Sequence, residues 1–402
     1  MRVTRRSLLA SGALTGAGLV LGACGSSASR DQLIAQGRAA ASGGVRYDGP
    51  PVELEFWNGF TGGDGPFMRD LVDQFNREND NVRVRMNVIL WVDYYQKTTA
   101  AVSSGTGPDI GVMQMDQIGT AAAHRIILPL DDVATEMGLR QEDFAAAVWD
   151  ASVVAGQRFG IPLDVHPLGM YVNRALVPEA TPTDRAQFLD VLADLKQEGI
   201  AGAWMSPFLF TGSLLFQTLL WQFGGELYTP GAERAAWDSD AGVEALSFMV
   251  DLVEKGYSIP DVGQDADNIG FKNGENAFFF SGCWSVNDFG ATPGLKWSPE
   301  VMPTLGDQPA VWANSHNFVL MRQPNLDEDK LQASAAFIDF LSRNSAAWAK
   351  AGMVPARTAE RDTKAVRKIK PLAPFVEEIP DVRFAPTVAG LSEVRANTLD
   401  IA

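Results

Sequence analysis

Apolar and polar residues alternate in three short stretches, at residues 52–60 (VELEFWNGF), 81–89 (NVRVRMNVI) and 108–114 (PDIGVMQ). A period of two predicts β-strands. Between these stretches, residues 65–79 and 92–105 carry apolar side chains at helical spacing and therefore predict helices. Because strands and helices alternate, the pattern favours an α/β fold with a mostly parallel sheet covered by helices.

The next part of the chain departs from this rhythm. Residues 158–176 (RFGIPLDVHPLGMYVNRAL) contain two prolines and then an extended run. The segment therefore predicts an extended run rather than another strand and helix unit. The remaining periodic segments predict helices at residues 183–199, 212–225, 240–256 and 333–352, and a buried strand followed by a turn at residues 276–284 (NAFFFSGCW).

The chain begins with a basic segment followed by a weakly apolar one. Arg2, Arg5 and Arg6 precede residues 8–21, an apolar stretch of about 14 residues that is too short to span a bilayer. The motif TRRSLL at residues 4–9 is typical of a twin-arginine export signal, with a Sec signal containing a chance arginine pair as the alternative. We therefore interpret residues 1–23 as a signal peptide.

The stretch LVLGACGSS at residues 19–27 places a cysteine directly after this apolar segment. It resembles a bacterial lipoprotein signal, in which the residues before Cys24 form the lipobox and Cys24 becomes the lipidated first residue. Residues 24–51 are small and polar with no sustained apolar period, which indicates a flexible tether. We therefore expect a lipid-anchored protein on the extracytoplasmic face of the cell membrane.

Charge and cysteine content narrow the class of protein further. The signal contains three of the 33 basic residues and no acidic residue. The rest of the chain therefore has 30 basic and 49 acidic residues, a net charge of −19. Such an acidic surface repels phosphate backbones, so we expect no nucleic-acid partner and no membrane association beyond the lipid. If Cys24 carries the lipid, only Cys283 remains, and an intramolecular disulfide is impossible. About 350 residues follow the tether, a length that favours two lobes.

Five segments together resemble the extracellular sugar-binding proteins of ABC importers, the family that includes maltose-binding protein. They occur in the family's order and are FWNGF before TGGDG (56–65), GPDIGVMQMD (107–116), GQRFGIPLDVHPLGMYVNRALV (156–177), FKNGENAFFFSGCW (271–284) and GMVPAR (352–357). The resemblance implies a two-lobed periplasmic-binding-protein-like fold (type II) with a hinged cleft. A ligand held between the lobes shifts an equilibrium between open and closed forms.

The resemblance also implies where the lobes begin and end. It places hinge crossings at residues 163–168 and near 307–313. Lobe one is then expected at residues 52–163 plus 313–360, and lobe two at 168–307 plus 361–402. Family members commonly continue with further helix after the segment that matches residues 385–398, whereas this chain ends at Ala402. Either the last element is short or the sequence is incomplete.

Candidate ligand-binding residues follow from the chemistry of a sugar, which offers an apolar face for aromatic stacking and a rim of hydroxyls for directional hydrogen bonds. Carried over by motif, Trp284 is the expected aromatic platform, and Asp116 follows a strand at its carboxyl end, where open α/β sheets bind ligands. Each of these residues also has a structural alternative, in the core or on a solvated loop. The other candidates are Asp164 and His166 on the crossover, Asn58 and Asp64 near the first loop, Trp57, and Trp312, Asn314 and His316 on the second crossing.

The expected cleft contains almost no Lys or Arg, which an anionic ligand would require. We therefore expect a neutral sugar or short oligosaccharide, with no cofactor and no metal, since three His and no Cys cluster make a zinc site improbable. The expected partners are a two-subunit ABC permease and its cytoplasmic ATPase, and we expect a monomer.

Two other function classes remain open from the sequence. An exported glycoside hydrolase could use Asp116 and Asp164 as a catalytic pair, although the sequence has no Gly-x-Ser-x-Gly and no His-Glu-x-x-His motif. We therefore expect that the protein is not an enzyme. A binding protein for glycerophosphodiesters or polyamines is the other alternative, because acidic residues suit a cation.

Overall fold

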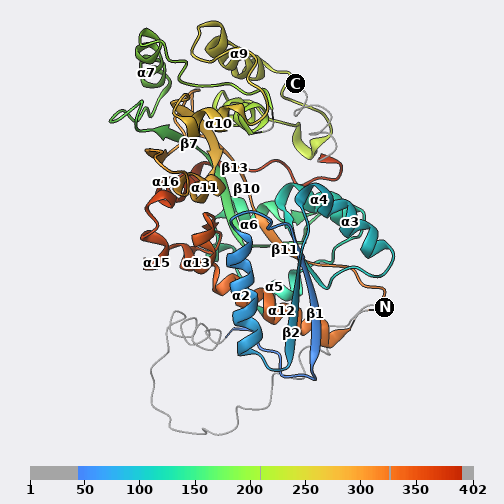
Figure 1. The fold of residues 1–402 in the computed structure, drawn as a ribbon. Helices are drawn as coiled ribbons and strands as arrows, with labels where there is room; N and C mark the ends of the chain where they lie inside the picture. Colours follow the sequence, from blue (N-terminus) through green and yellow to red (C-terminus); the bar gives the residue numbers. More distant parts are fainter. Residues whose placement is uncertain (1–43, 209, 326, 392–402) are drawn as a thin grey trace, which may run out of the picture. The chain divides into compact units, whose positions relative to one another are not determined.

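In the computed structural model, which describes residues 44–208, 210–325 and 327–391, the alternating segment at residue 52 forms β1 (Val52–Asn58). It lies beside β2 (Val82–Val88) on one side (Figure 1) and beside β3 (Ile110–Gln114) on the other, and it is parallel to both. Two antiparallel strands complete this sheet, β11 (His316–Leu320) beside β3 and β6 (Ile161–Pro162) beside β11. The first sheet therefore has the order β2-β1-β3-β11-β6.

The helices predicted at residues 65–79 and 92–105 are both present in the region of the first sheet, with ends within two residues of the predicted positions. The structure has α2 (Gly65–Glu78) against β2 and α12 (Glu328–Arg343) against β1. The buried face of α2 carries Met68, Leu71 and Phe75, at the spacing of one helical stripe. The other helices of this region are α3 (Trp91–Ser103), α4 (Met115–Ala123), α5 (Asp131–Glu136), α6 (Ala146–Ala151), α13 (Ser345–Trp348), α14 (Thr358–Arg361) and α15 (Lys364–Arg367).

The second sheet is built around β7 (Asp164–Asn173), which is buried at every position. Four antiparallel neighbours pair with it: β8 (Phe278–Gly282), β9 (Trp297–Glu300), β10 (Val311–Asn314) and β12 (Val354–Pro355). A further strand, β13 (Val382–Arg383), is parallel to β10. The expectation of a mostly parallel sheet is therefore correct for β1 to β3 and wrong for this second sheet. Strands β4 (Val153–Val154) and β5 (Gln157–Arg158) form a separate hairpin.

Helices also cover the second sheet, with α8 (Leu215–Gln222) in contact with β10 and α16 (Ala373–Glu377) in contact with β7. The others are α7 (Arg185–Gln197), α9 (Asp240–Glu254), α10 (Ala266–Asn273) and α11 (Val286–Gly290). Short helical turns are η1 (Gln141–Asp143), η2 (Phe210–Leu214), η3 (Pro230–Ala232), η4 (Cys283–Ser285), η5 (Ala349–Ala351), η6 (Lys370–Leu372) and η7 (Ile379–Asp381).

Two predicted helices differ from the observed ones. The helix expected at residues 212–225 begins as a π-helical turn, η2, and only α8 is α-helical. The helix expected at residues 333–352 is interrupted after α12, because Asn344 leaves helical geometry with φ −106° and ψ 13°. The Asn344 side chain donates to the carbonyl of Phe340, which also accepts from the Asn344 backbone N–H at 3.1 Å. Such local side-chain bonds of Asn favour the end of a helix over its continuation.

The chain passes from one sheet to the other at two places. Leu163 separates β6 of the first sheet from β7 of the second, and Ser315 separates β10 of the second sheet from β11 of the first. The lobe boundaries given above remain predictions. Cys24, the signal peptide and the tether before residue 44 lie outside the described residues, as do residues 392–402.

Candidate functional site

The parallel strands of the first sheet deliver candidate residues to one edge, because their carboxyl ends point the same way. Asn58 ends β1, and Asp116 lies in the first turn of α4, directly after β3. The Asn58 Oδ1 accepts a hydrogen bond from the Phe60 backbone N–H at 3.1 Å. Its Nδ2 is buried without a hydrogen-bond partner in the described part of the chain, so both N–H groups of this amide are available to donate.

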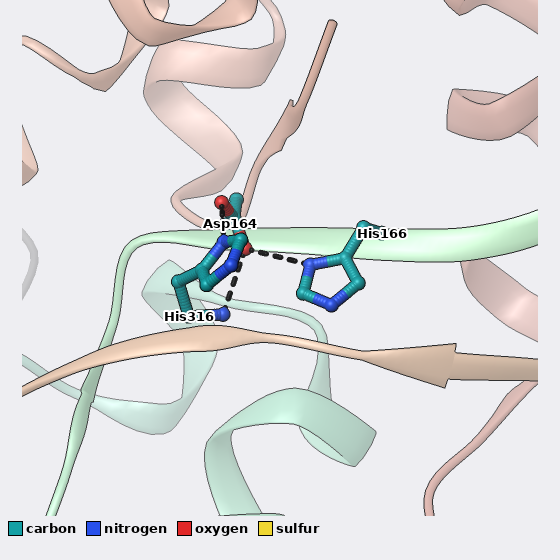
Figure 2. A group of neighbouring side chains, drawn as sticks. All are labelled: Asp164, His166 and His316. Carbon is teal, nitrogen blue, oxygen red and sulfur yellow. Dashed lines mark hydrogen bonds and ion pairs between the residues drawn. The ribbon is translucent and has the colours of Figure 1, made fainter. Parts of the chain in front are cut away.

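Asp164 lies at the passage between the sheets, where it accepts four hydrogen bonds. Its Oδ1 accepts from the His316 backbone N–H at 2.9 Å and lies 3.2 Å from His166 Nδ1. Its Oδ2 lies 2.8 Å from His316 Nδ1 (Figure 2) and 2.8 Å from the indole nitrogen of Trp348. Asp164 is 0% exposed, and His166 and His316 are 3% and 4% exposed. The carboxylate is therefore a buried hub beneath two imidazoles.

The protonation of this hub follows from burial and hydrogen bonding. Burial alone would raise the pKa of Asp164, but His316 and His166 outweigh it and hold that pKa far below its usual range. Burial lowers the pKa of His166, with a further lowering from His316. Burial also opposes protonation of His316, but its contacts with Asp164 raise its pKa above the ordinary value. The ionised Asp164 carboxylate therefore faces two imidazoles with opposite shifts, of which His316 holds its second proton to a higher pH than His166.

Aromatic rings surround the two imidazoles. The His166 ring centre is 5.8 Å from Trp284 and 6.5 Å from Trp312, and these two indoles stand edge to face at 6.4 Å. The His316 ring stacks on Trp91 at 5.7 Å with an angle of 13° between planes. The structure thus brings Trp284, Trp312, His166 and His316 together, as a site that stacks rings and bonds hydroxyls requires.

Asp116 and Asn314 lie beside this cluster. With Trp312 they line a hollow of about 10 Å³ between α4, β10 and residues 384–385, which has room for about one water molecule. The Asn314 Oδ1 accepts from the backbone N–H groups of Met115 and Ser315 at 3.0 and 2.9 Å. Its carbonyl is therefore engaged in joining β10 to α4.

Asp64 and Trp57 lie at the margin of the cluster. Asp64 precedes α2, and its Oδ1 accepts from the Gly62 backbone N–H at 3.1 Å. Burial raises the pKa of Asp64, and attraction to His316 partly offsets this. Trp57 is half-buried on β1 and packs against the core. Asp64 is therefore linked electrostatically to His316 alone of the two imidazoles, and Trp57 lies mainly in packing.

A larger cavity of about 300 Å³ adjoins Trp284. Its walls come from the segment before α8, from the start of α10, and from β8 and η4. Asp267 is buried in this wall, with its Oδ2 2.5 Å from the Thr211 hydroxyl, and burial raises its pKa. No Lys or Arg is among the described residues that line the cavity, which are Ser206, Phe208, Thr211, Gln264, Asp265, Asp267, Asn268, Phe279, Ser281, Trp284, Ser285 and Asp288.

A family model of bacterial extracellular solute-binding proteins matches residues 70–373. The chain belongs to this family. It is 22% identical over 362 residues to the galactooligosaccharide-binding protein of Bacillus subtilis, an alignment covering 85% of this chain and 82% of the relative. It is also 22% identical over 310 residues to the maltooligosaccharide ABC transporter solute-binding lipoprotein of Streptococcus pneumoniae, covering 72% and 70%.

Solved structures show the same architecture. The cyclic α-maltosyl-1,6-maltose binding protein of Arthrobacter globiformis superposes with a TM-score of 0.74 at 24% identity, covering 86% of this chain and 90% of that one. The two-lobed periplasmic-binding-protein-like fold expected from the sequence is therefore confirmed. Within residues 44–208, 210–325 and 327–391, no helix combines the length and apolar character needed to cross a bilayer.

One group in this solute-binding protein has the spacing of a metal site. Asp164, His166 and His316 each offer a donor atom within 4.8 Å of the others. However, each Asp164 oxygen already accepts two hydrogen bonds, one of them from the backbone of His316 and one from Trp348. A metal ion bound among these atoms would replace the protons on the two imidazole Nδ1 atoms and break their hydrogen bonds to Asp164. The donor set therefore fits a hydrogen-bonded hub better than a metal centre.

Three residues of the site escaped the sequence predictions. Trp91 begins α3 shortly after β2, and Phe60 follows β1, so both lie at the carboxyl edge of the parallel strands. The same reasoning that identified Asp116 could have found them. Trp348 is fully buried, and its indole N–H donates to Asp164. No local signal in the sequence reveals that contact.

Proposed function

We propose that this solute-binding protein captures a neutral sugar or short oligosaccharide in the cleft between its lobes. The observation that carries the proposal is the meeting of two indoles, Trp284 and Trp312, with two imidazoles from the strands that join the sheets. Indole faces suit the C–H face of a pyranose, and imidazole nitrogens suit hydroxyls. Among the described residues lining the two cavities next to Trp284 and Trp312, none is Lys or Arg.

The printed functions of relatives support the same ligand class. The Bacillus subtilis relative is named for galactooligosaccharides and the Streptococcus pneumoniae relative for maltooligosaccharides. These names differ in the sugar but agree on a neutral saccharide. We therefore propose the class of ligand and not a particular linkage.

The described residues that line the cavity of about 300 Å³ all belong to the second expected lobe, so a ligand that contacts both lobes requires the cleft between them to widen. The hollow beside Asp116 and Trp312 holds about 10 Å³, far below the several hundred Å³ of a typical ligand pocket. We propose that the lobes, residues 52–163 plus 313–360 and 168–307 plus 361–402, separate about the passages near Leu163 and Ser315 and close on the ligand. A ligand that contacts both lobes only in the closed form stabilises that form.

The delivery step follows from the family. We propose that the closed protein docks on a two-subunit permease driven by a cytoplasmic ATPase, and that a lipid on Cys24 holds the monomer at the extracytoplasmic face of the membrane. The part of the expected tether before residue 44 would leave the folded part free to reach the permease. Tyr47, which also lies in the expected tether, is instead buried in the core. Lipoprotein is also part of the printed name of the Streptococcus pneumoniae relative.

A calorimetric titration panel tests the ligand class. The probes are maltotriose and a β-linked galactooligosaccharide as neutral saccharides, glucose 1-phosphate as an anion, and spermidine as a cation. We expect saturable heat with at least one neutral saccharide and none with the anion. Heat only with glucose 1-phosphate or only with spermidine would contradict the proposal.

One observation favours a second candidate, a polyamine-binding protein. Asp265, Asp267 and Asp288 all line the cavity beside Trp284, and such a wall attracts a cation. Spermidine in the same panel distinguishes the two. For the glycosidase alternative, Asp164 is fully buried beneath the imidazoles with both oxygens bonded to protein donors. Incubation with the saccharide that gives heat should return it unchanged, whereas hydrolysis products would support the enzyme.

A further inference from the structure

The hub formed by Asp164, His166 and His316 joins side chains from the two passages between the sheets. Asp164 and His166 lie two residues apart on β7 and therefore on the same face of that strand. His316 is the first residue of β11 and approaches from the opposite passage between the sheets. The two imidazole centres are 4.6 Å apart, and one carboxylate is bonded to both (Figure 2).

Hydrogen-bond chemistry fixes which imidazole nitrogens face the carboxylate with a proton. The Trp348 indole and the His316 backbone N–H can only donate, so the Asp164 oxygens must accept from them. An ionised carboxylate has no proton to give. The Nδ1 atoms of His166 and His316, at 3.2 and 2.8 Å from it, must therefore both carry protons.

The outer nitrogens then differ between the two rings. If His166 is neutral with its proton on Nδ1, its Nε2 carries a lone pair and accepts hydrogen bonds. If His316 is an imidazolium, its Nε2 carries a proton and donates. The opposite pKa shifts of the two rings support this division: burial and His316 lower the pKa of His166, whereas Asp164 overcomes burial to raise the pKa of His316. Two imidazoliums this close would repel each other.

Neither Nε2 has a hydrogen-bond partner among the residues that the structure describes, and the side chains of His166 and His316 are only 4% and 6% exposed. Neither atom is among the fully enclosed unpartnered atoms of these residues, so both keep access to a ligand or water that can satisfy them. In Figure 2 the second nitrogen of His166 lies on the side of the ring away from Asp164. That ring also contacts Trp284 and Trp312.

We propose that Asp164 is a positioning residue that gives the two imidazoles opposite roles, with His166 Nε2 accepting a hydrogen bond from the ligand and His316 Nε2 donating one to it. This inference rests on the proposed function, because it places the ligand against these rings. The matching chemical group is a pair of neighbouring hydroxyls, since one hydroxyl can donate to His166 while the next accepts from His316. A sugar unit whose hydroxyl is replaced by hydrogen at either position loses one of these bonds.

The same arrangement makes binding sensitive to pH. Protonation of His166 converts its acceptor into a donor and places a second positive charge 4.6 Å from His316. The charged groups facing the two rings are Asp164 from β7, Asp116 from α4 and Asp64 from the loop before α2. The indoles packed around them are uncharged. Affinity for a neutral saccharide should therefore fall as pH falls through the pKa of His166.

Long-range ¹H–¹⁵N NMR of the full folded chain with ¹⁵N-labelled histidine tests the assignment without any ligand. The sequence contains three His, so the exposed His124 provides the reference signal, and His166→Gln and His316→Gln variants assign the other two. At neutral pH we expect His166 to show a protonated Nδ1 and a bare Nε2, and His316 to show protons on both nitrogens. In a titration between about pH 5 and 9, the imidazolium form of His316 should lose a proton at a higher pH than the imidazolium form of His166 does.

Three outcomes would overturn the proposal: a proton on His166 Nε2 in the neutral ring, the same protonation state for both rings, or signals that shift on addition of Zn²⁺ and return with a chelator. The last would instead identify a metal centre. Because the sample holds no saccharide, failure of this assignment is distinguishable from failure of the calorimetric panel. A panel without saccharide binding would remove the ligand while leaving the NMR result valid for the hub itself.

Discussion

Replacing Asp164 with Asn should destabilise the folded protein strongly, because this carboxylate accepts four hydrogen bonds in a fully buried position. The amide oxygen of Asn can replace one carboxylate oxygen, but its NH₂ group then faces N–H donors. The charged His316 also loses its counter-ion. Removing one partner of a buried charge pair costs about 3–5 kcal/mol, and we expect an Asp164→Asn cost in that range.

The pH dependence of this cost follows from His316. A group whose pKa is raised on folding contributes stability fully below its unfolded pKa, about 6.5 for His, and that contribution is lost as pH rises through the folded pKa. Asp164, whose pKa is lowered, contributes above its unfolded value of about 3.9. The difference between wild type and Asp164→Asn should therefore be larger at about pH 6 than at about pH 9.

Urea unfolding followed by tryptophan fluorescence at both pH values measures this effect. Asp93→Asn is the matched control, because Asp93 pairs with Lys97 on the exposed surface of α3 at 3.0 Å. Such a surface pair contributes about 0.3–0.5 kcal/mol. An Asp164→Asn cost below about 1 kcal/mol, or one that is identical at the two pH values, would refute the role of the hub.

Four further substitutions test other parts of the account. Trp284→Ala should weaken saccharide binding by more than about 1 kcal/mol, as expected for an aromatic residue at the centre of a site; unchanged calorimetric affinity in a folded variant removes it from the site. Gly282→Ala should weaken binding in the same assay, because a Cβ at this position overlaps the Trp284 ring; wild-type affinity would show that the indole position does not matter. Glu378→Gln should reduce the decrease in the free energy of unfolding between about pH 5 and 8. Burial raises the pKa of Glu378 well above its usual value, and a group with a raised pKa loses its stabilising contribution as pH rises above its unfolded pKa. An equal decrease in both proteins, measured by urea unfolding at the two pH values, would contradict this. Cys24→Ser should release the protein from the membrane fraction, and retention there would count against lipidation.

Local patterns predicted the first sheet well. The helix expected at residues 65–79 is α2 (Gly65–Glu78), and the strand at residues 52–60 is β1 (Val52–Asn58). Periodicity succeeds here because each element buries one face against its immediate neighbours. The antiparallel pairing of β7 with β8, in contrast, joins Leu168 to Gly282. Nothing local in either segment specifies a partner so distant in sequence.

The candidate site shows the same limit. A period of two places Asp164 and His166 on one face of a strand, so their contact is predictable from the sequence alone. The bonds from Asp164 to His316 and Trp348 join residues 152 and 184 positions away, and only the folded chain reveals them. Trp91 could have been found, because it follows β2 at the sheet edge where Asp116 was expected.

A crystal structure of the protein grown with the neutral saccharide that gives the largest calorimetric response tests the central claim most directly. The account predicts a sugar ring against Trp284, with hydroxyls in hydrogen-bond distance of His166 and His316 and with no Lys or Arg touching the ligand. A saccharide bound elsewhere on the surface, with the space between these rings still closed, would contradict the account, as would a ligand held there by guanidinium or ammonium groups.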